Sequence, residues 1–180
     1  MRVVAGQYGG RTLKTLEGKN TRPTGDKVRA AIFSMLGQYF DGGLVLDLYS
    51  GSGGLAIEAV SRGFSSAVLV ERDRKAQAII TENIAMTKES DRFQLFKMDA
   101  TRALSQLSGQ FDLIFLDPPY AQEMIEKTIH DLVDQQLLAE DVKIVCETDK
   151  MVDLPETILD LTLVKQKTYG ISKITIYERG

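Results

Sequence analysis

The chain of 180 residues contains one cysteine, one histidine and no tryptophan. A single cysteine excludes an internal disulfide framework, and Cys146 lies in the apolar run 142–146, so we expect it to be buried in a protein of the reducing cytoplasm. His130 has no cysteine pair beside it, so the sequence predicts no metal site. No apolar run approaches membrane-spanning length, and the N-terminus lacks the apolar core of a signal peptide.

The net charge of −3 is unevenly distributed. Residues 1–29 carry seven basic and two acidic side chains, a net charge of +5, so the remaining residues carry −8. A basic segment on an acidic body predicts binding to a polyanion. A solvated N-terminal segment without a partner explains the same charges equally well.

The length and ordinary composition predict one domain over residues 1–180. Residues 1–41 are expected to form a basic extension, with a hairpin around Gly9-Gly10 and a helix that starts at Thr24 or Gly25. Residues 42–180 are expected to form the core, an α/β fold whose mostly parallel sheet has helices on both faces. The end of the chain predicts an antiparallel hairpin through Tyr169-Gly170, which gives seven strands. The expected strands cover residues 44–48, 67–71, 93–96, 111–116, 142–147, 158–167 and 171–177, and the expected core helices residues 53–62, 73–87, 100–107 and 121–136.

Two of the four prolines stand side by side in Asp117-Pro118-Pro119-Tyr120, directly after the expected strand 111–116. Pro118 restricts Asp117 to extended geometry, and neither proline can donate an N–H to a neighbouring strand. The strand must therefore end in a stiff loop that carries a carboxylate and an aromatic ring. At the carboxyl edge of an open α/β sheet, such a loop stands where ligands bind. Taken alone, the four residues are equally compatible with a rigid turn that binds nothing.

A glycine-rich segment from Asp47 to Ala56 joins the first expected strand to the next helix. Glycines allow positive φ and close backbone approach, and a helix N-terminus presents free N–H groups. Glu71 ends the second strand, where a carboxylate can accept both hydroxyls of a ribose. Asp99 follows the third strand and could receive an adenine amine, although a role as helix N-cap explains it nearly as well. These features alone suit a nicotinamide cofactor and S-adenosylmethionine equally.

The combination of both segments favours a methyltransferase that acts on an amine. The exocyclic amine of a nucleobase is a poor nucleophile, because its lone pair is delocalised into the ring. Asp117 and a loop carbonyl can accept its two hydrogens, and Tyr120 can stack on the base and hold it in line. S-adenosylmethionine supplies the methyl group, so the reaction requires neither a metal nor a strong base. The expected catalytic residues are Asp117, Pro118, Pro119 and Tyr120, and the expected cofactor-binding residues are Asp47, Tyr49, Gly51, Gly53, Gly54, Glu71, Arg72, Asp99, Ala100 and Asp117.

Several motifs together carry a family resemblance that covers essentially the whole chain: Arg2-Val3-Val4-Ala5-Gly6, Thr21-Arg22-Pro23-Thr24, Asp26-Lys27-Val28-Arg29, Asp47 to Gly54, Asp117 to Tyr120 and Tyr169-Gly170. The chain resembles the bacterial 16S rRNA guanine-N2 methyltransferases of the RsmD type, which belong to the Class I S-adenosylmethionine-dependent methyltransferases. The resemblance implies a Rossmann-like fold. Ala30 departs from the pattern, which has glutamate there.

By the same resemblance, the partner is small-subunit rRNA or the assembling or assembled 30S particle, and the substrate is a guanine. The resemblance and the basic segment together imply phosphate contacts, and Arg22-Pro23-Thr24 is also a candidate lid over the cofactor. Nothing in the sequence indicates an obligate dimer, so we expect a monomer. The expected RNA-binding residues are Arg11, Lys14, Arg22, Thr24, Lys27 and Arg29.

Three alternatives stay open from the residues. A DNA adenine-N6 or cytosine-N4 methyltransferase uses the same loop on a similar amine, but the chain shows no obvious insert for reading a DNA sequence. A nicotinamide-dependent oxidoreductase fits the glycine-rich segment and Glu71, but lacks evident hydride-transfer machinery. The third alternative is an RNA-binding module without catalytic activity. A protein-glutamine methyltransferase would more naturally have asparagine at position 117.

Overall fold

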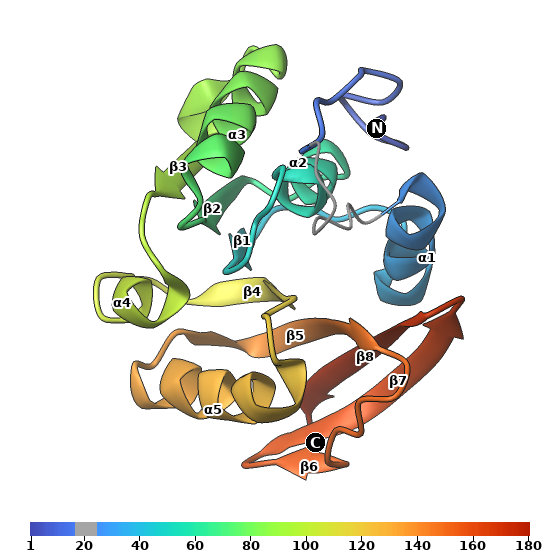
Figure 1. The fold of residues 1–180 in the computed structure, drawn as a ribbon, viewed down its shortest axis with the longest axis vertical. Coiled ribbons are helices and arrows are strands. Elements are labelled where there is room, and N and C mark those ends of the chain that lie inside the picture. Colours follow the sequence, from blue (N-terminus) through green and yellow to red (C-terminus); the bar gives the residue numbers. More distant parts are fainter. Residues whose placement is uncertain (17–24) are drawn as a thin grey trace.

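The structure is a computed structural model, and it describes residues 1–16 and 25–180. Within these residues the centre of the molecule is an eight-stranded sheet in the order β3-β2-β1-β4-β5-β8-β7-β6 (Figure 1). The strands are β1 (Leu44–Asp47), β2 (Ser66–Val70), β3 (Phe93–Phe96), β4 (Phe111–Leu116), β5 (Leu138–Asp149), β6 (Thr157–Ile158), β7 (Leu161–Tyr169) and β8 (Ser172–Arg179). The helices are α1 (Asp26–Leu36), α2 (Gly54–Ser61), α3 (Arg74–Met86), α4 (Ala100–Leu104) and α5 (Ala121–Asp134), with a 3₁₀ turn over Ser90–Arg92.

The pairing of the strands confirms the expected α/β fold. Strands β1 to β5 pair in parallel, and β5, β8, β7 and β6 then pair antiparallel. The prediction of seven strands is wrong by one, because the two-residue β6 pairs with the start of β7 and is too short to produce an alternating pattern. Strand β5 also begins earlier than expected, because Leu138 pairs with Phe111 before a shift in register.

Helices cover both faces of the sheet, as the alternation of strands and helices predicts. Figure 1 shows α1, α2 and α3 on one face and α4 and α5 on the other. Successive residues of a strand point to opposite faces, so Phe115 packs toward the first group of helices and Leu116 toward the second. Cys146 is fully buried in the second layer, as predicted, and burial raises the pKa of its thiol.

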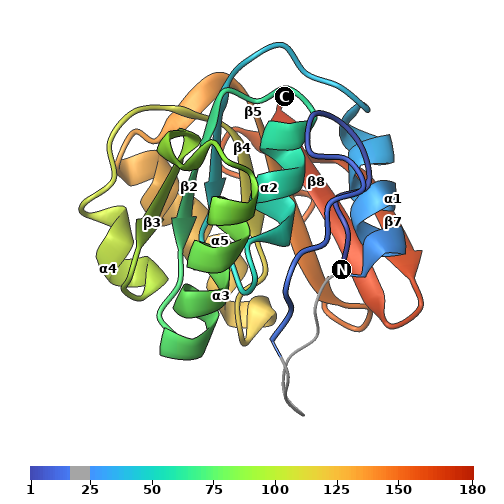
Figure 2. The same cartoon turned by 90° about the horizontal axis from the view of Figure 1, so that it is seen from above.

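The N-terminal segment runs along α2, with α1 on its other side (Figure 2). The expected hairpin around Gly9-Gly10 is confirmed, because Val3 N–H donates to the Arg11 carbonyl and an isolated bridge joins Arg2 to Thr12. Helix α1 begins at Asp26 after Gly25, which also agrees with the sequence. The proposed division into residues 1–41 and 42–180 stays a prediction. In the part of the chain that the structure describes, no helix is long and apolar enough to cross a membrane.

A buried carboxylate, Glu58 of α2, connects the N-terminal segment to α1. Its oxygens accept hydrogen bonds from Arg29 Nε at 3.2 Å and from Arg62 Nε at 2.8 Å. They also accept from the backbone N–H groups of Val4 at 2.8 Å and Ala5 at 3.1 Å. All three charged side chains are almost completely buried. Such a cluster is stable only when each charge is paired and hydrogen-bonded, so Glu58 is the common acceptor that holds this side of the molecule together.

Candidate active site

Three carboxylates meet at the carboxyl edge of the central parallel strands. Asp47 ends β1, Asp117 directly follows β4, and Glu147 lies near the end of β5. Leu116 of β4 pairs with Cys146 of β5, so the next residue on each strand is Asp117 beside Glu147. All three acidic residues line one cavity, on the face of the sheet that α1 covers.

The Asp117 carboxyl group is hydrogen-bonded to Glu147, which requires a proton on one of the two acids. Although Asp117 as a whole residue remains exposed at the surface, its carboxyl group is desolvated in the cavity. Desolvation, followed by repulsion from the negative charges of Glu147 and Asp47, raises the pKa of Asp117 to about 8. The two acids therefore share a proton more readily than isolated carboxyl groups do. A strongly shifted carboxyl group in a cavity is typical of a functional site.

Asp47 is the most deeply buried of the three acids, with 3% of its surface exposed. Burial, followed by the negative charges of Glu71 and Glu147, raises its pKa to about 7, and a hydrogen bond from the Tyr49 N–H opposes this shift. The site therefore concentrates negative charge where water has little access. A ligand that offers hydrogen-bond donors or positive charge would relieve this repulsion.

The glycine-rich loop between β1 and α2 forms another wall of the cavity. Gly51 and Gly53 have φ values of 58° and 83°, which favour glycine. The Gly51 N–H donates to Glu71 Oε1 at 2.9 Å, so the end of β2 holds the loop in place. A Cβ on Gly53 would lie 3.2 Å from the Leu69 side chain, whereas the space around the Cα of Gly51 is open. The loop can therefore accept a ligand closely against its backbone.

The Asp-Pro-Pro-Tyr loop joins β4 to α5. Pro118 is buried and Pro119 is exposed, so the first proline anchors the loop. Tyr120 adopts the left-handed conformation, with φ 56° and ψ 51°, and its residue surface is 82% exposed. Holding a non-glycine residue in this conformation costs about 1–3 kcal/mol and is common at functional sites. The ring of Tyr120 does not line the cavity, so stacking on a base stays a prediction.

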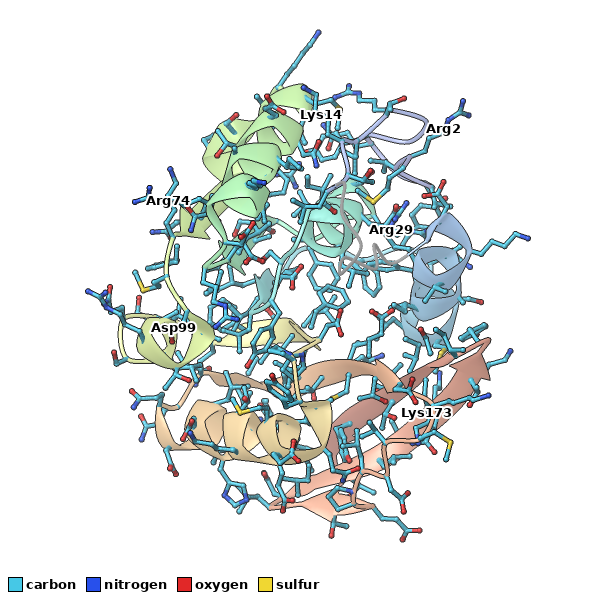
Figure 3. The ribbon with its side chains drawn as sticks, in the orientation of Figure 1. Arg2, Lys14, Arg29, Arg74, Asp99 and Lys173 are labelled. Atoms are coloured by element: carbon cyan, nitrogen blue, oxygen red, sulfur yellow. The ribbon has the colours of Figure 1, made fainter. Side chains whose placement is uncertain are left out.

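The cavity brings together five of the predicted cofactor-binding residues: Asp47, Tyr49, Gly51, Gly54 and Asp117. Gly53 and Glu71 support the loop without lining the cavity. The other three lie elsewhere: Arg72 is exposed, Asp99 caps the start of α4 by accepting from the Arg102 N–H at 2.9 Å, and Ala100 is buried (Figure 3). The N-cap interpretation of Asp99 is therefore confirmed, and contact with an adenine stays a prediction.

Sequence reasoning missed Glu147 as a site residue, although it placed this residue at the end of an expected strand. The available signal was positional, because a carboxylate at the end of a parallel strand next to Asp117 must lie at the same edge of the sheet. Met1 was also missed as a residue that lines the cavity. Its sulfur lies close to Gly54, since a Cβ added to Gly54 would be 3.0 Å from that sulfur. No motif in the sequence indicated that the N-terminal residue reaches this cavity.

The predicted RNA contacts have different outcomes. The prediction for Arg29 is wrong, because its side chain is completely buried between α1 and α2 and paired with Glu58 (Figure 3). Arg11 is exposed, but its Nη1 donates to the Thr87 carbonyl at 3.1 Å. Lys14 is exposed and pairs with Glu82 at 3.0 Å, and Lys27 is exposed. Arg22 and Thr24 lie outside the described residues. Phosphate contacts by the exposed residues stay predictions.

Within residues 1–16 and 25–180, no group of three or more histidine, cysteine, aspartate or glutamate side chains is placed to hold a metal ion.

The sheet order and the site at the ends of β1 and β4 define a Rossmann-like methyltransferase. A solved structure of a conserved hypothetical protein from Streptococcus pyogenes is 62% identical in sequence, with a TM-score of 0.83 over 85% of this chain and 96% of that one. The solved structure of yhhF from Escherichia coli is 30% identical, with a TM-score of 0.87 over 99% of this chain and 97% of that one.

The chain belongs to the family described as "Conserved hypothetical protein 95", which matches residues 1–178 and is the RsmD family of methyltransferases. YlbH of Bacillus subtilis (strain 168) is 44% identical over 99% of both chains. The protein named "Ribosomal RNA small subunit methyltransferase D" of Escherichia coli (strain K12) is 31% identical over 99% of this chain and 90% of the relative. Membership of this family favours methyl transfer over the nicotinamide alternative.

Proposed function

We propose that the protein transfers the methyl group of S-adenosylmethionine to the exocyclic N2 amine of a guanine in small-subunit (16S) rRNA. The observation that carries this proposal is the position of Asp117, on a proline-stiffened loop beside the glycine-rich loop of β1 and at the wall of one cavity. The names of the relatives support ribosomal RNA as the substrate class. The carboxyl groups that line the cavity, which accept hydrogen bonds, support an amine as the acceptor of the methyl group.

The residues present fit S-adenosylmethionine. The open face of Gly51 allows close approach of its amino-acid part, and Asp47 offers an acceptor for its ammonium group. Glu71 directly follows β2, where ribose hydroxyls are expected. When bound, S-adenosylmethionine supplies an electrophilic methyl group with a good sulfur leaving group. A buried carboxylate such as Asp47 also favours a cationic ligand, because that charge relieves repulsion in the cavity.

Asp117 orients the amine of the target base. Its carboxylate accepts one amine hydrogen and a second acceptor at the same edge of the sheet accepts the other, which draws the nitrogen out of conjugation and directs its lone pair toward the methyl group. The lone pair forms the new N–C bond as the C–S bond breaks, and the extra proton on nitrogen leaves afterwards. The prolines hold Asp117 at the required place before the base arrives, so little ordering is needed during the reaction.

The surroundings of the loop suit an RNA substrate. The exposed ring of Tyr120 stands on the same loop as Asp117 and can stack on the flipped base. Lys14 and Lys27 are exposed on the N-terminal side and can hold phosphates, and Arg11 and the Arg22-Pro23-Thr24 segment are further candidates. We expect the small-subunit rRNA or its 30S particle to be the partner and the protein to act as a monomer.

The test measures transfer of labelled methyl groups to small-subunit rRNA and to 30S particles that lack the modification. The Asp117→Ala variant should lose about 10²–10³-fold in kcat, in line with the loss of one preorganised polar group at a reacting centre. Asp134→Ala, at the exposed end of α5, is the matched control and should keep full activity. Full activity of Asp117→Ala would contradict the mechanism.

The same preparation identifies the product and the cofactor. Mapping modified nucleotides in cells with and without the protein should show the loss of one N2-methylguanine in small-subunit rRNA. Loss of an adenine or cytosine modification would contradict the proposed substrate. Calorimetric titration should show binding of S-adenosylhomocysteine, and binding of NADH alone would overturn the assignment of the cofactor.

A further inference from the structure

We propose that Glu147 selects guanine, by accepting the N1–H and one N2 hydrogen of the base while Asp117 accepts the other N2 hydrogen. This inference rests on the proposed function. It explains how the site distinguishes guanine from adenine and cytosine, which the Asp-Pro-Pro-Tyr loop cannot do by itself. The geometry is provided by the pairing of β4 with β5, which sets the two acids next to each other at the edge of the sheet. Their side chains are joined by a hydrogen bond and line the same cavity.

The space next to the two acids suits a flat ring. Phe115 and Val145 precede Asp117 and Glu147 by two residues, so their side chains point to the same face and line the cavity below the acids. Ile32 of α1 lines the same cavity. An aromatic base can therefore enter between apolar side chains, while its polar edge faces the two carboxyl groups. This combination of apolar walls and a few convergent polar groups is typical of ligand sites.

The hydrogen-bonding edges of the bases decide which one such an acidic pair accepts. In guanine the N1–H donor is adjacent to the N2 amine, so one carboxylate can accept from both at once. In adenine the ring nitrogen next to the amine is an acceptor, and the same holds for cytosine, so a carboxylate at that position is repelled. An ionised carboxylate has acceptors only. Glu147 thus favours guanine and opposes the other two amine-bearing bases.

In the free protein, the two acids already form a hydrogen bond with one another at the place proposed for the base. The donors of guanine replace this hydrogen bond between Asp117 and Glu147 on binding, while the shared proton is released to solvent. Asp47, Arg29 and Glu71 are the other charged groups at or near this site. Arg29 forms ion pairs with Glu58 at 3.2 Å and with Asp26 at 2.8 Å.

The test compares three bases at the methylated position of a reconstituted small-subunit particle: guanine, 2-aminopurine and inosine. 2-Aminopurine keeps the amine but has an acceptor at N1, and inosine keeps N1–H but has no amine. The wild-type protein should prefer guanine over 2-aminopurine by about 10- to 100-fold in kcat/KM, the discrimination expected of a bidentate contact. Inosine should accept no methyl group.

The Glu147→Gln variant should reduce that preference to below about 3-fold, because glutamine donates to an N1 acceptor as readily as it accepts from an N1–H. Glu147→Asp keeps the carboxylate and should keep the preference at a lower rate. Glu140→Gln, exposed near the other end of β5, is the matched control and should behave as the wild type. A purely structural role of Glu147 would lower activity on both bases equally and leave the ratio unchanged.

The outcomes separate this inference from the proposed function. If the wild-type protein methylates no guanine, the proposed function is wrong. If it methylates guanine and Glu147→Gln retains the full preference over 2-aminopurine, only the role of Glu147 is wrong. Melting temperatures and S-adenosylhomocysteine binding test whether each of the two variants is folded. Should Glu147→Gln not fold, a loss of the preference in the Glu147→Asp variant would also contradict the inference.

Discussion

Replacing Glu58 by glutamine should destabilise the protein strongly, although the two side chains have almost the same size and shape. Glu58 accepts four hydrogen bonds, two from the arginine side chains of Arg29 and Arg62 and two from backbone N–H groups. Glutamine keeps one acceptor oxygen and places an NH₂ group against donors, so Arg29 and Arg62 both lose their ion pair with Glu58, and Arg29 keeps only the one with Asp26 at 2.8 Å among the ion pairs of the described residues. Removing one partner from a buried ion cluster costs about 3–5 kcal/mol.

For a protein of this size, each kcal/mol lowers the melting temperature by about 2–4 °C, so we expect a fall of about 6–20 °C. Calorimetry and urea denaturation measure it. Glu82→Gln provides the control, because its pair with Lys14 is exposed and such pairs contribute about 0–1 kcal/mol. If both variants lost the same small amount, the reasoning about the buried cluster would be refuted.

Further expectations concern the loop, the ionisation of the site and the N-terminal turn. Tyr120→Ala should raise KM for the RNA by about 5- to 150-fold, because stacking on the base is lost. Tyr120→Phe keeps the ring and should leave KM unchanged, so an equal rise of KM in both variants would refute stacking. The raised pKa of Asp117 means that its carboxylate forms as pH rises through about 8, so kcat/KM should increase between about pH 7 and 9. Glu147→Gln removes one cause of that shift, so a midpoint that did not move to lower pH would contradict the coupling. Gly6→Ala would place a Cβ 2.0 Å from the Ser61 carbonyl oxygen at φ 87°, and thermal denaturation should show a clear loss of stability.

Local chemistry made the main elements of the fold predictable. Alternating apolar runs gave the order of strands and helices, and the prolines after Leu116 located the end of β4 and the Asp117 loop. Both signals are short-range, because they depend on side-chain periodicity and on the restricted φ of proline. The two-residue β6 and the early start of β5 could not be recognised, since each depends on the strand beside it.

The errors in the site also come from long-range contacts. Arg29 looked like a phosphate ligand because basic residues surround it in sequence, but Glu58, which neutralises it, lies on another helix. Glu147 was read only as the end of a strand, because its nearness to Asp117 arises from the pairing of β4 with β5. Charge along a sequence therefore indicated a basic segment without showing which of its members face solvent.

The shift in register between β4 and β5 has a consequence for how this family can vary. Phe111 pairs with Leu138, whereas Leu113 pairs with Lys143, so the extra residues of β5 are taken up at the amino end of the pair. Residues added or removed near Ala139 would be absorbed there and would leave Asp117 level with Glu147. Relatives can thus differ in length near the start of β5 without changing the level of Asp117 and Glu147, whereas a single insertion between Lys143 and Glu147 would put a different side chain opposite Asp117.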